Sequence, residues 1–186
     1  MQILKDEIRE HILTIAEDSF YEKGFGDTTT RAIANEVGIS VSNLYLYFQN
    51  KEVIFHTLVD GFCASLLRDM ERFLAHDDDT GVEPAIAALL QKTIATDRKK
   101  FVIVAEKSQG TKYGDVKDRL IAMIQGHIER QIKEEFSRDP VLPRIIAQNF
   151  VEGILLIAKE YTDAKSLESR LRFFAQYHMS GMRPFL

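Results

Sequence analysis

The sequence predicts an all-α protein of about nine helices, and three observations support this fold class. Apolar residues recur at the three- and four-residue spacing of amphipathic helices along most of the 186 residues. Glycines, prolines and helix-capping residues interrupt this spacing at intervals that suit helices. No segment shows the alternation of apolar and polar residues that is typical of a strand, and we find no internal repeat or low-complexity tract. The length fits one ordinary domain, or a small domain attached to a larger one.

Four helices are expected in the N-terminal part, each begun by a capping residue or ended by a glycine. Glycine adopts the conformation of a helix C-terminus at little cost, so Gly24 and Gly38 are expected to end the first and second helices. Ser40 is expected to cap the third helix, and Asn50 the fourth. The expected ranges are about 3–23, from Thr28 or Thr29 to just before Gly38, from Ser40 to about Phe48, and from Asn50 to about Phe73.

Five further helices are expected after an acidic loop at 77–79. Gly110, Gly114, Pro140 and the region of Asp163 separate these helices, because such residues commonly interrupt helical segments. The expected ranges are about 82–96, 98–109, 114–136, 141–161 and 164–183.

The composition is that of a globular protein. The chain has 45% apolar residues, a net charge of −4 and a single cysteine, Cys63. One cysteine cannot close an internal disulfide, which suits a reducing cytoplasm. The charged first residues lack the apolar region of a signal peptide. The longest apolar runs, 101–105 and 154–158, are too short to span a bilayer. We therefore expect a cytoplasmic protein with no membrane partner.

Residues 30–47 have the pattern of a helix-turn-helix. Ile33 and Leu44 supply the apolar contacts between two short helices, and Ala34 is small where the helices cross. Gly38 lies in the turn, where a positive φ angle costs glycine little. This motif leaves its second helix projecting, and such a helix fits the major groove of DNA. Charge does not support the prediction, because the first 51 residues hold five Lys and Arg against eight Asp and Glu.

The same region resembles the signature of the TetR family of transcription regulators. The resemblance covers residues 20–52, where the segments FYEKGF, TTTRAIA and GISVSNLYLYFQNKE match in register. It implies a helix-turn-helix DNA-binding domain at 1–49 and a helical ligand-binding and dimerisation domain at 50–186. It further implies a regulator, usually a repressor, that binds a palindromic operator in double-stranded DNA as a homodimer and is released by a small lipophilic ligand.

The resemblance also implies a set of DNA contacts. Arg31 occupies a position that reaches a base edge or a phosphate, and Tyr45 and Lys51 are similar to phosphate contacts of the family. Lys51 has a physical argument as well, since a cation at a helix N-terminus is unfavourable unless an anion lies nearby. Val41 or Leu46 can contact thymine methyl groups. The complete expected set is Thr30, Arg31, Val41, Ser42, Asn43, Tyr45, Leu46, Tyr47 and Lys51.

Several of these residues have a purely structural interpretation too. Tyr45 can pack against the first helix, and Lys51 can be an ordinary solvated side chain. Asn43 can bond only to nearby backbone, as asparagine often does at helix ends. The sequence alone leaves both interpretations open.

The C-terminal part resembles the variable effector-binding and dimerisation region of the family. Apolar residues occur on more than one side of the helices expected at 141–161 and 164–183, and large exposed apolar patches mark interfaces. An apolar pocket for a lipophilic ligand is expected. Core packing is the simpler interpretation of the same residues, in particular of His127. The expected pocket residues are Phe62, Leu66, Phe101, Val104, Lys107, Tyr113, His127, Asn149 and Phe150.

Other function classes have less support from the sequence. The five histidines lack the paired spacing of metal ligands, no glycine-rich phosphate loop is present, and Cys63 has no nucleophile signature. The sequence therefore predicts no catalytic site, no metal and no cofactor. The alternative function is a DNA-binding nucleoid-associated or interaction protein without a small-molecule effector, because such a protein would share the same DNA-binding part.

Overall fold

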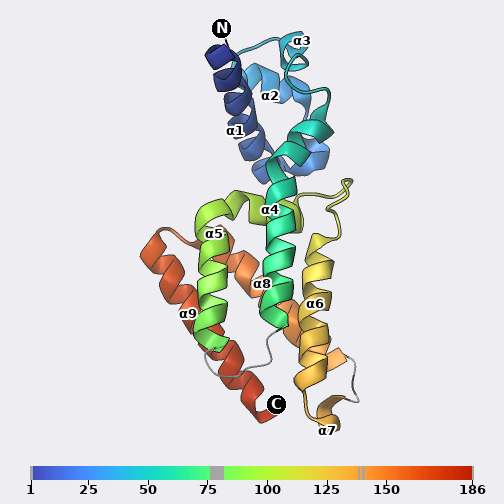
Figure 1. Cartoon of the computed structure of the whole chain (residues 1–186), viewed down its shortest axis with the longest axis vertical. Coiled ribbons are helices and arrows are strands. Elements are labelled where there is room, and N and C mark those ends of the chain that lie inside the picture. The colour runs from blue at the N-terminus through green and yellow to red at the C-terminus, as the bar shows by residue number, and fades with distance from the viewer. Residues whose placement is uncertain (1, 76–81, 138, 140, 186) are drawn as a thin grey trace. The chain divides into compact units, whose positions relative to one another are not determined.

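A computed structural model describes residues 2–75, 82–137, 139 and 141–185, and these ranges hold nine α-helices, one 3-10 helix and no strand (Figure 1). The expected all-α fold is therefore confirmed. The loop expected at 77–79 and the break at Pro140 lie outside the described residues. The helices are α1 (Gln2–Asp27), α2 (Thr30–Val37), α3 (Val41–Leu44), α4 (Lys51–Leu74), α5 (Val82–Glu106), α6 (Val116–Gln131), α7 (Glu134–Ser137), α8 (Val141–Glu160), α9 (Ala164–Met182) and η1 (Arg183–Phe185).

The helices form two compact units. Unit 1 comprises Met1–Ala64 and Lys99–Asp115, and unit 2 comprises Ser65–Arg98 and Val116–Leu186. The long helices α4 and α5 each contribute residues to both units. The sequence predicts a DNA-binding domain at 1–49 and a ligand-binding and dimerisation domain at 50–186. These domains are defined by function and do not coincide with the two compact units, so this division stays a prediction.

Unit 1 is built around an aromatic cluster formed by the C-terminal part of α1 and the N-terminal part of α4. The rings of Phe20, Phe25 and Phe55 lie with their centroids 5.1 to 6.0 Å apart, two of the three pairs edge to face. Ile33 and Leu44, both fully buried, join α2 and α3 to the core of this unit. Burial of these large side chains supplies the main favourable free energy for the unit.

The end of α1 is shaped by Gly24. Its φ of 80° and ψ of 170° lie in a region that only glycine adopts without strain, so the regular helix stops here as expected. The next amide, that of Phe25, donates to the carbonyl of Lys107 at 2.8 Å. The buried hydroxyl of Thr28 donates to the carbonyl of Gly24 at 2.7 Å. Lys107, the residue directly after α5, is thus bonded to the end of α1.

In unit 2, α8 packs against both α6 and α9. Its buried face consists of Pro143, Ala147, Val151, Ile154, Leu155 and Ala158. Gly153 permits the close approach of α9, since a Cβ atom at this position would overlap the ring of Phe174. Ala147 on the same helix is fully buried.

Among the described residues, α8 is the one helix that is long and apolar enough to cross a membrane, with a mean hydropathy of 1.5. This is weak evidence for a membrane span, because the core helix of a helical bundle passes the same test. The expectation of no membrane partner stays a prediction.

The expected break between helices 82–96 and 98–109 is present as a kink within α5, because the backbone of Asp97 is non-helical. Two other helix boundaries differ from the sequence-based expectation. The third helix ends at Leu44 instead of Phe48. The expected helix 114–136 is divided into α6 and α7. The physical reason for this division is that the amide of Lys133 donates to the carbonyl of Phe185 at 2.9 Å instead of continuing the helix.

Candidate nucleic-acid interface

The helices α2 and α3 form a helix-turn-helix whose ends are fixed by short side chains. The hydroxyl of Thr29 accepts a hydrogen bond from the amide of Ala32 at 3.1 Å and caps α2. Gly38 ends α2 in the left-handed conformation, with φ 80° and ψ 26°. The hydroxyl of Ser40 accepts from the amide of Asn43 at 3.1 Å and caps α3. Each of these turns is encoded within a few residues, and for this reason the sequence could predict it.

Burial separates the structural residues of this motif from its surface. Ile33, Ala34 and Leu44 are fully buried, and Phe48 is nearly so. These side chains hold the two helices together and leave the opposite side of α3 free. The expected packing of the motif is therefore confirmed.

The expected DNA-contacting residues differ in how far they are exposed. Arg31 and Ser42 are exposed, Tyr45 is 48% exposed and Leu46 is 82% exposed. Thr30, Val41, Asn43, Tyr47 and Lys51 are half-buried. The exposed members come from α2, from α3 and from the turn that follows α3, so they share the surface of the motif. Their contacts with DNA stay predictions.

Tyr45 has a partner within the motif. Its hydroxyl lies 3.3 Å from the hydroxyl of Thr30, which joins the turn after α3 to the start of α2. Two of the expected DNA-contacting residues are thus brought together. Tyr45 is about half exposed, which agrees both with a DNA contact and with packing against the first helix, so both interpretations stay predictions.

Lys51 has a role that the sequence did not reveal. Its ammonium group donates to the carbonyls of Phe25 at 2.6 Å and Thr28 at 2.9 Å, and a longer bond of 3.3 Å reaches Gly26. The same ammonium lies 4.2 Å from the centroid of the Phe25 ring. Carbonyls at the end of α1 and at Thr28, just after it, therefore bind this cation. We expected a phosphate to supply the negative charge near Lys51. In the structure, the partial negative charges of these carbonyl oxygens lie beside its ammonium group.

The N-terminus of α4 is completed by Asn50. Its side-chain oxygen accepts from the amide of Val53 at 2.8 Å, the bond of a helix N-cap. This confirms the expected cap, and it fixes the position of α4 directly after the helix-turn-helix.

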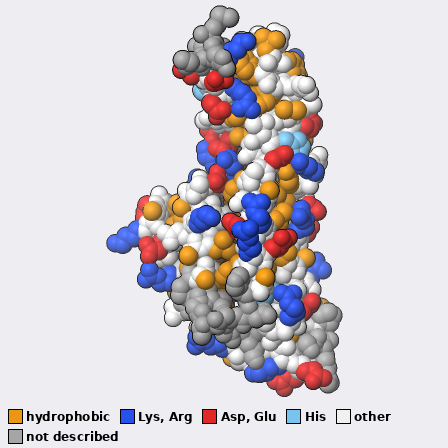
Figure 2. Space-filling view, in the orientation of Figure 1, with side chains coloured by type: hydrophobic (Ala, Val, Ile, Leu, Met, Phe, Trp, Pro, Cys, Tyr) orange, Lys and Arg blue, Asp and Glu red, His pale blue; other side chains and the backbone are white. Residues whose placement is uncertain are grey.

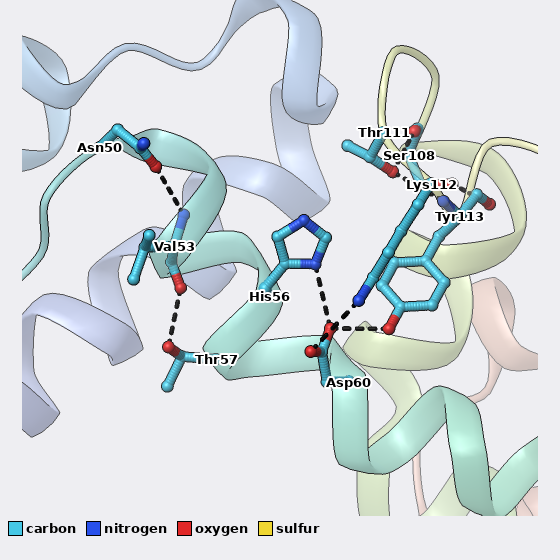
Figure 3. Close-up of polar contacts among 9 residues, drawn as sticks. All are labelled: Asn50, Val53, His56, Thr57, Asp60, Ser108, Thr111, Lys112 and Tyr113. Atoms are coloured by element: carbon cyan, nitrogen blue, oxygen red, sulfur yellow. Dashed lines mark hydrogen bonds and ion pairs between the residues drawn. The ribbon is translucent and has the colours of Figure 1, made fainter.

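A polar cluster on α4 was not predicted from the sequence (Figure 3). The carboxylate of Asp60 accepts from the hydroxyl of Tyr113 at 2.6 Å and lies 3.4 Å from the ammonium of Lys112. The Nδ1 atom of His56, one helical turn earlier, lies 3.0 Å from the same carboxylate. We call these four residues the Asp60 cluster. The four-residue spacing of His56 and Asp60 was the one signal in the sequence for this cluster. That spacing does not predict that Lys112 and Tyr113 are the partners from the loop.

The loop that carries Tyr113 is fixed by its own hydrogen bonds. The buried hydroxyl of Ser108 donates to the carbonyl of Tyr113 at 2.8 Å. The hydroxyl of Thr111 donates to the carbonyl of Ser108 at 2.7 Å and accepts from the amide of Tyr113 at 3.1 Å. Figure 3 shows this loop directed toward α4. The Asp60 cluster therefore joins two ordered segments of unit 1.

The protonation states of the Asp60 cluster follow from its contacts. Partial burial raises the pKa of Asp60, but hydrogen bonds from Tyr113, His56 and Lys112 outweigh that effect, so its pKa lies below its ordinary value. Burial and the hydrogen bond with Asp60 raise the pKa of Tyr113. At neutral pH the carboxylate is thus an ionised acceptor and the phenol a protonated donor.

The residues expected to line an effector pocket are divided between the two units. Phe62, Phe101, Val104, Lys107 and Tyr113 belong to unit 1. The members in unit 2 are Leu66, His127, Asn149 and Phe150.

Several of these side chains already have partners. His127 lies 3.0 Å from the carbonyl of Leu74, as its interpretation as a satisfied core histidine requires. Phe150 packs against Phe174 and His178, with ring centroids 5.5 and 5.1 Å away. Asn149 is exposed. The effector pocket itself stays a prediction.

Charge is mixed over the surface. Figure 2 shows Lys and Arg side chains interspersed with Asp and Glu over the visible face. Within the segment from Thr28 to Asn50, the charged residues are Arg31 and Glu36 alone. A DNA contact made by this segment would therefore depend more on its polar and apolar side chains than is usual.

Comparisons with known proteins agree with this geometry. Residues 12–58 match the family model described as bacterial regulatory proteins, tetR family. The chain is similar to the biofilm operon icaADBC HTH-type negative transcriptional regulator IcaR of Staphylococcus epidermidis. The two are 24% identical over 167 residues, which cover 85% of this chain and 82% of IcaR.

Shorter matches are confined to part of the relative. The nucleoid occlusion factor SlmA of Mannheimia succiniciproducens is 38% identical over 61 residues, which cover 32% of this chain and 28% of SlmA. With other curated HTH-type regulators, the match spans 35% of the relative's length.

The fold likeness extends over nearly the whole chain. The crystal structure of a TetR-family transcriptional regulator from Bordetella parapertussis superposes with a TM-score of 0.70 at 18% identity. The superposition covers 96% of this chain and 97% of the other. At this identity the likeness concerns the fold.

Proposed function

Because this chain belongs to the TetR family of bacterial transcriptional regulators, we propose that it is a repressor that binds a palindromic operator as a homodimer and is released by a small lipophilic ligand. The observation that carries the DNA-binding part is the helix-turn-helix with an exposed surface at Arg31, Ser42, Tyr45 and Leu46. A helix presented in this way can enter the major groove. The similarity to a negative regulator, IcaR, favours repression.

An exposed apolar face on α8 and α9 supports the homodimer. Ile145 and Leu156 on α8 are 47% and 58% exposed, and Phe173 and Tyr177 on α9 are 72% and 66% exposed. Apolar side chains of this size are normally covered, and a contiguous exposed group of them marks an interface. A second copy of the chain would cover the same face by two-fold symmetry and would present two recognition helices to a palindrome.

Selection of bound duplexes from a random pool by the full-length protein tests this function. We expect a palindromic consensus and a complex that contains two protein chains. Arg31→Ala should weaken binding of the selected duplex about tenfold or more in a dimer, because a charged DNA contact is lost in each half-site. Arg119→Ala on the exposed side of α6 removes the same charge and should leave affinity nearly unchanged. Failure to retain any duplex at low salt would contradict the proposal.

The alternative of a nucleoid-associated protein without an effector is favoured by one observation, the similarity to the nucleoid occlusion factor SlmA over 61 residues. A thermal-shift screen with aromatic and fatty acids distinguishes the two functions. A compound that stabilises the protein and weakens its binding to the selected duplex supports a sensor. If no compound in such a screen changes DNA affinity, the nucleoid-associated function is favoured.

A further inference from the structure

The turn after α3 carries an apolar side chain that the fold does not use. Leu46 is 82% exposed, which makes it the most exposed of the large apolar side chains in the described part of the chain. It lies between Leu44 and Phe48, which are 0% and 2% exposed. An exposed leucine between two core residues contributes nothing to the packing of unit 1. The apolar surface of Leu46 is therefore free to contact a partner molecule.

The backbone holds Leu46 in a defined position. Its amide donates to the carbonyl of Asn43 at 3.0 Å, and the amides of Tyr47 and Phe48 both donate to the carbonyl of Leu44 at 3.0 and 3.1 Å. The buried side chains of Leu44 and Phe48 anchor the turn on both sides. A side chain presented from such a turn loses little conformational freedom on binding, because its backbone is ordered beforehand.

The neighbours of Leu46 limit what this surface can recognise. Ser42, four residues earlier, is exposed, but its hydroxyl lies 3.0 Å from that of Ser40. Val41, the other candidate for an apolar contact, is half-buried. No charged residue occurs between Glu36 and Lys51. The surface around Leu46 is therefore suited to an apolar contact rather than to an ion pair.

We propose that Leu46 is a specificity-determining residue that contacts the C5-methyl group of a thymine in each half of the operator. This inference rests on the proposed function and deepens it. The thymine methyl is the apolar group that natural bases present in the major groove, so it is the natural partner of an exposed leucine on a recognition element.

Replacement of thymine by deoxyuridine, which removes only the methyl group, tests the contact. In the duplex selected by the wild-type protein, thymines are replaced at symmetric pairs of positions, one pair at a time. Loss of one buried methyl in each half-site should weaken wild-type binding about 15-fold at one pair of thymines. Leu46→Ala should bind the unmodified duplex more weakly and should be insensitive to deoxyuridine at that pair.

Two further variants control this experiment. Leu46→Met keeps an apolar side chain and should retain sensitivity to deoxyuridine. Val41→Ala should retain it as well, because this variant leaves Leu46 in place and Val41 is half-buried. Since Leu46 is exposed, Leu46→Ala should melt at the wild-type temperature. Equal deoxyuridine penalties in wild type and Leu46→Ala, or no penalty at any thymine, would overturn this inference alone. A wild-type protein that binds no duplex would overturn the proposed function together with it.

Discussion

A single side chain, Lys51, fixes the end of α1 in the DNA-binding motif. Its ammonium group binds the carbonyls of Phe25, Gly26 and Thr28, and these residues come immediately before α2. Hydrogen bonds with a charged partner contribute more to stability than those between neutral groups. A lysine in this position therefore stabilises the local fold whether or not it also contacts a phosphate.

Replacement of this lysine by methionine tests its structural role. Lys51→Met should lower the free energy of unfolding by about 1–3 kcal/mol, because the carbonyls at the end of α1 lose their cation. Urea denaturation measures the change. Lys23→Met, an exposed lysine of α1, provides the matched control and should be nearly neutral. Unchanged stability combined with weaker DNA binding would instead favour phosphate contact as the main role of Lys51.

At the scale of elements, the Asp60 cluster joins α4 to the loop between α5 and α6. Asp60 on the helix and Tyr113 on the loop are 53 residues apart in the sequence. The hydroxyl of Tyr113 donates a 2.6 Å hydrogen bond to the carboxylate of Asp60. The same helix begins at Lys51, directly after the helix-turn-helix. The cluster thus determines where this loop lies relative to the helix that follows the DNA-binding motif within unit 1.

The lowered pKa of Asp60 predicts a pH dependence. A carboxyl group with a lower pKa in the folded state stabilises the protein above its unfolded-state pKa, and this contribution is lost as the pH falls through the folded-state value. Asp60→Asn should therefore cost about 0.5–1 kcal/mol at neutral pH, since the group is half exposed. The difference from wild type should shrink as the pH falls below about 4, the ordinary aspartate pKa, toward the lower folded-state value.

Urea denaturation of both proteins between neutral and acidic pH measures this difference. Tyr113→Phe removes the strongest donor and should show the same direction of change. Asp27→Asn replaces an exposed aspartate outside the cluster and should give a difference that varies little with pH. A cost of Asp60→Asn that is constant across the pH range would show that the carboxylate charge is not what stabilises the cluster.

At the scale of the whole molecule, the proposed function requires two copies of the chain, since a palindrome is read by a two-fold dimer. The exposed apolar residues of α8 and α9 are the surface on which we expect the copies to meet. The opposite faces of these two helices pack in the core of unit 2, where Leu155 of α8 and Leu171 of α9 are buried. In a monomer the second apolar face of each helix would be exposed to water, which is unfavourable.

A charge at Phe173, the most exposed large apolar residue of this face, should separate the copies. Phe173→Asp should raise the dimer dissociation constant by about 100-fold or more, because an unpaired carboxylate would have to be buried. Light scattering after gel filtration measures the mass, and operator affinity should fall in parallel. Ala122→Asp on the exposed side of α6 introduces the same charge and should leave the dimer intact. A dimer that survives Phe173→Asp would place the interface elsewhere.

Local features of this protein were predictable from the sequence by itself. The stop at Gly24, the left-handed turn at Gly38 and the caps at Ser40 and Asn50 each depend on bonds that span only a few residues. Spacing and residue type carry such information directly. The helical class and the helix-turn-helix followed from these features.

Contacts between distant segments were decided by the tertiary structure. The bonds from Lys51 to the end of α1 and from Tyr113 to Asp60 join residues 23 to 53 positions apart. The C-terminal part of α5, from Lys99 onward, belongs to the same compact unit as the helix-turn-helix, and the amide of Lys133 ends α6 by bonding to Phe185. Such pairings depend on how helices pack, and amphipathic spacing shows that a face is buried without showing what covers it.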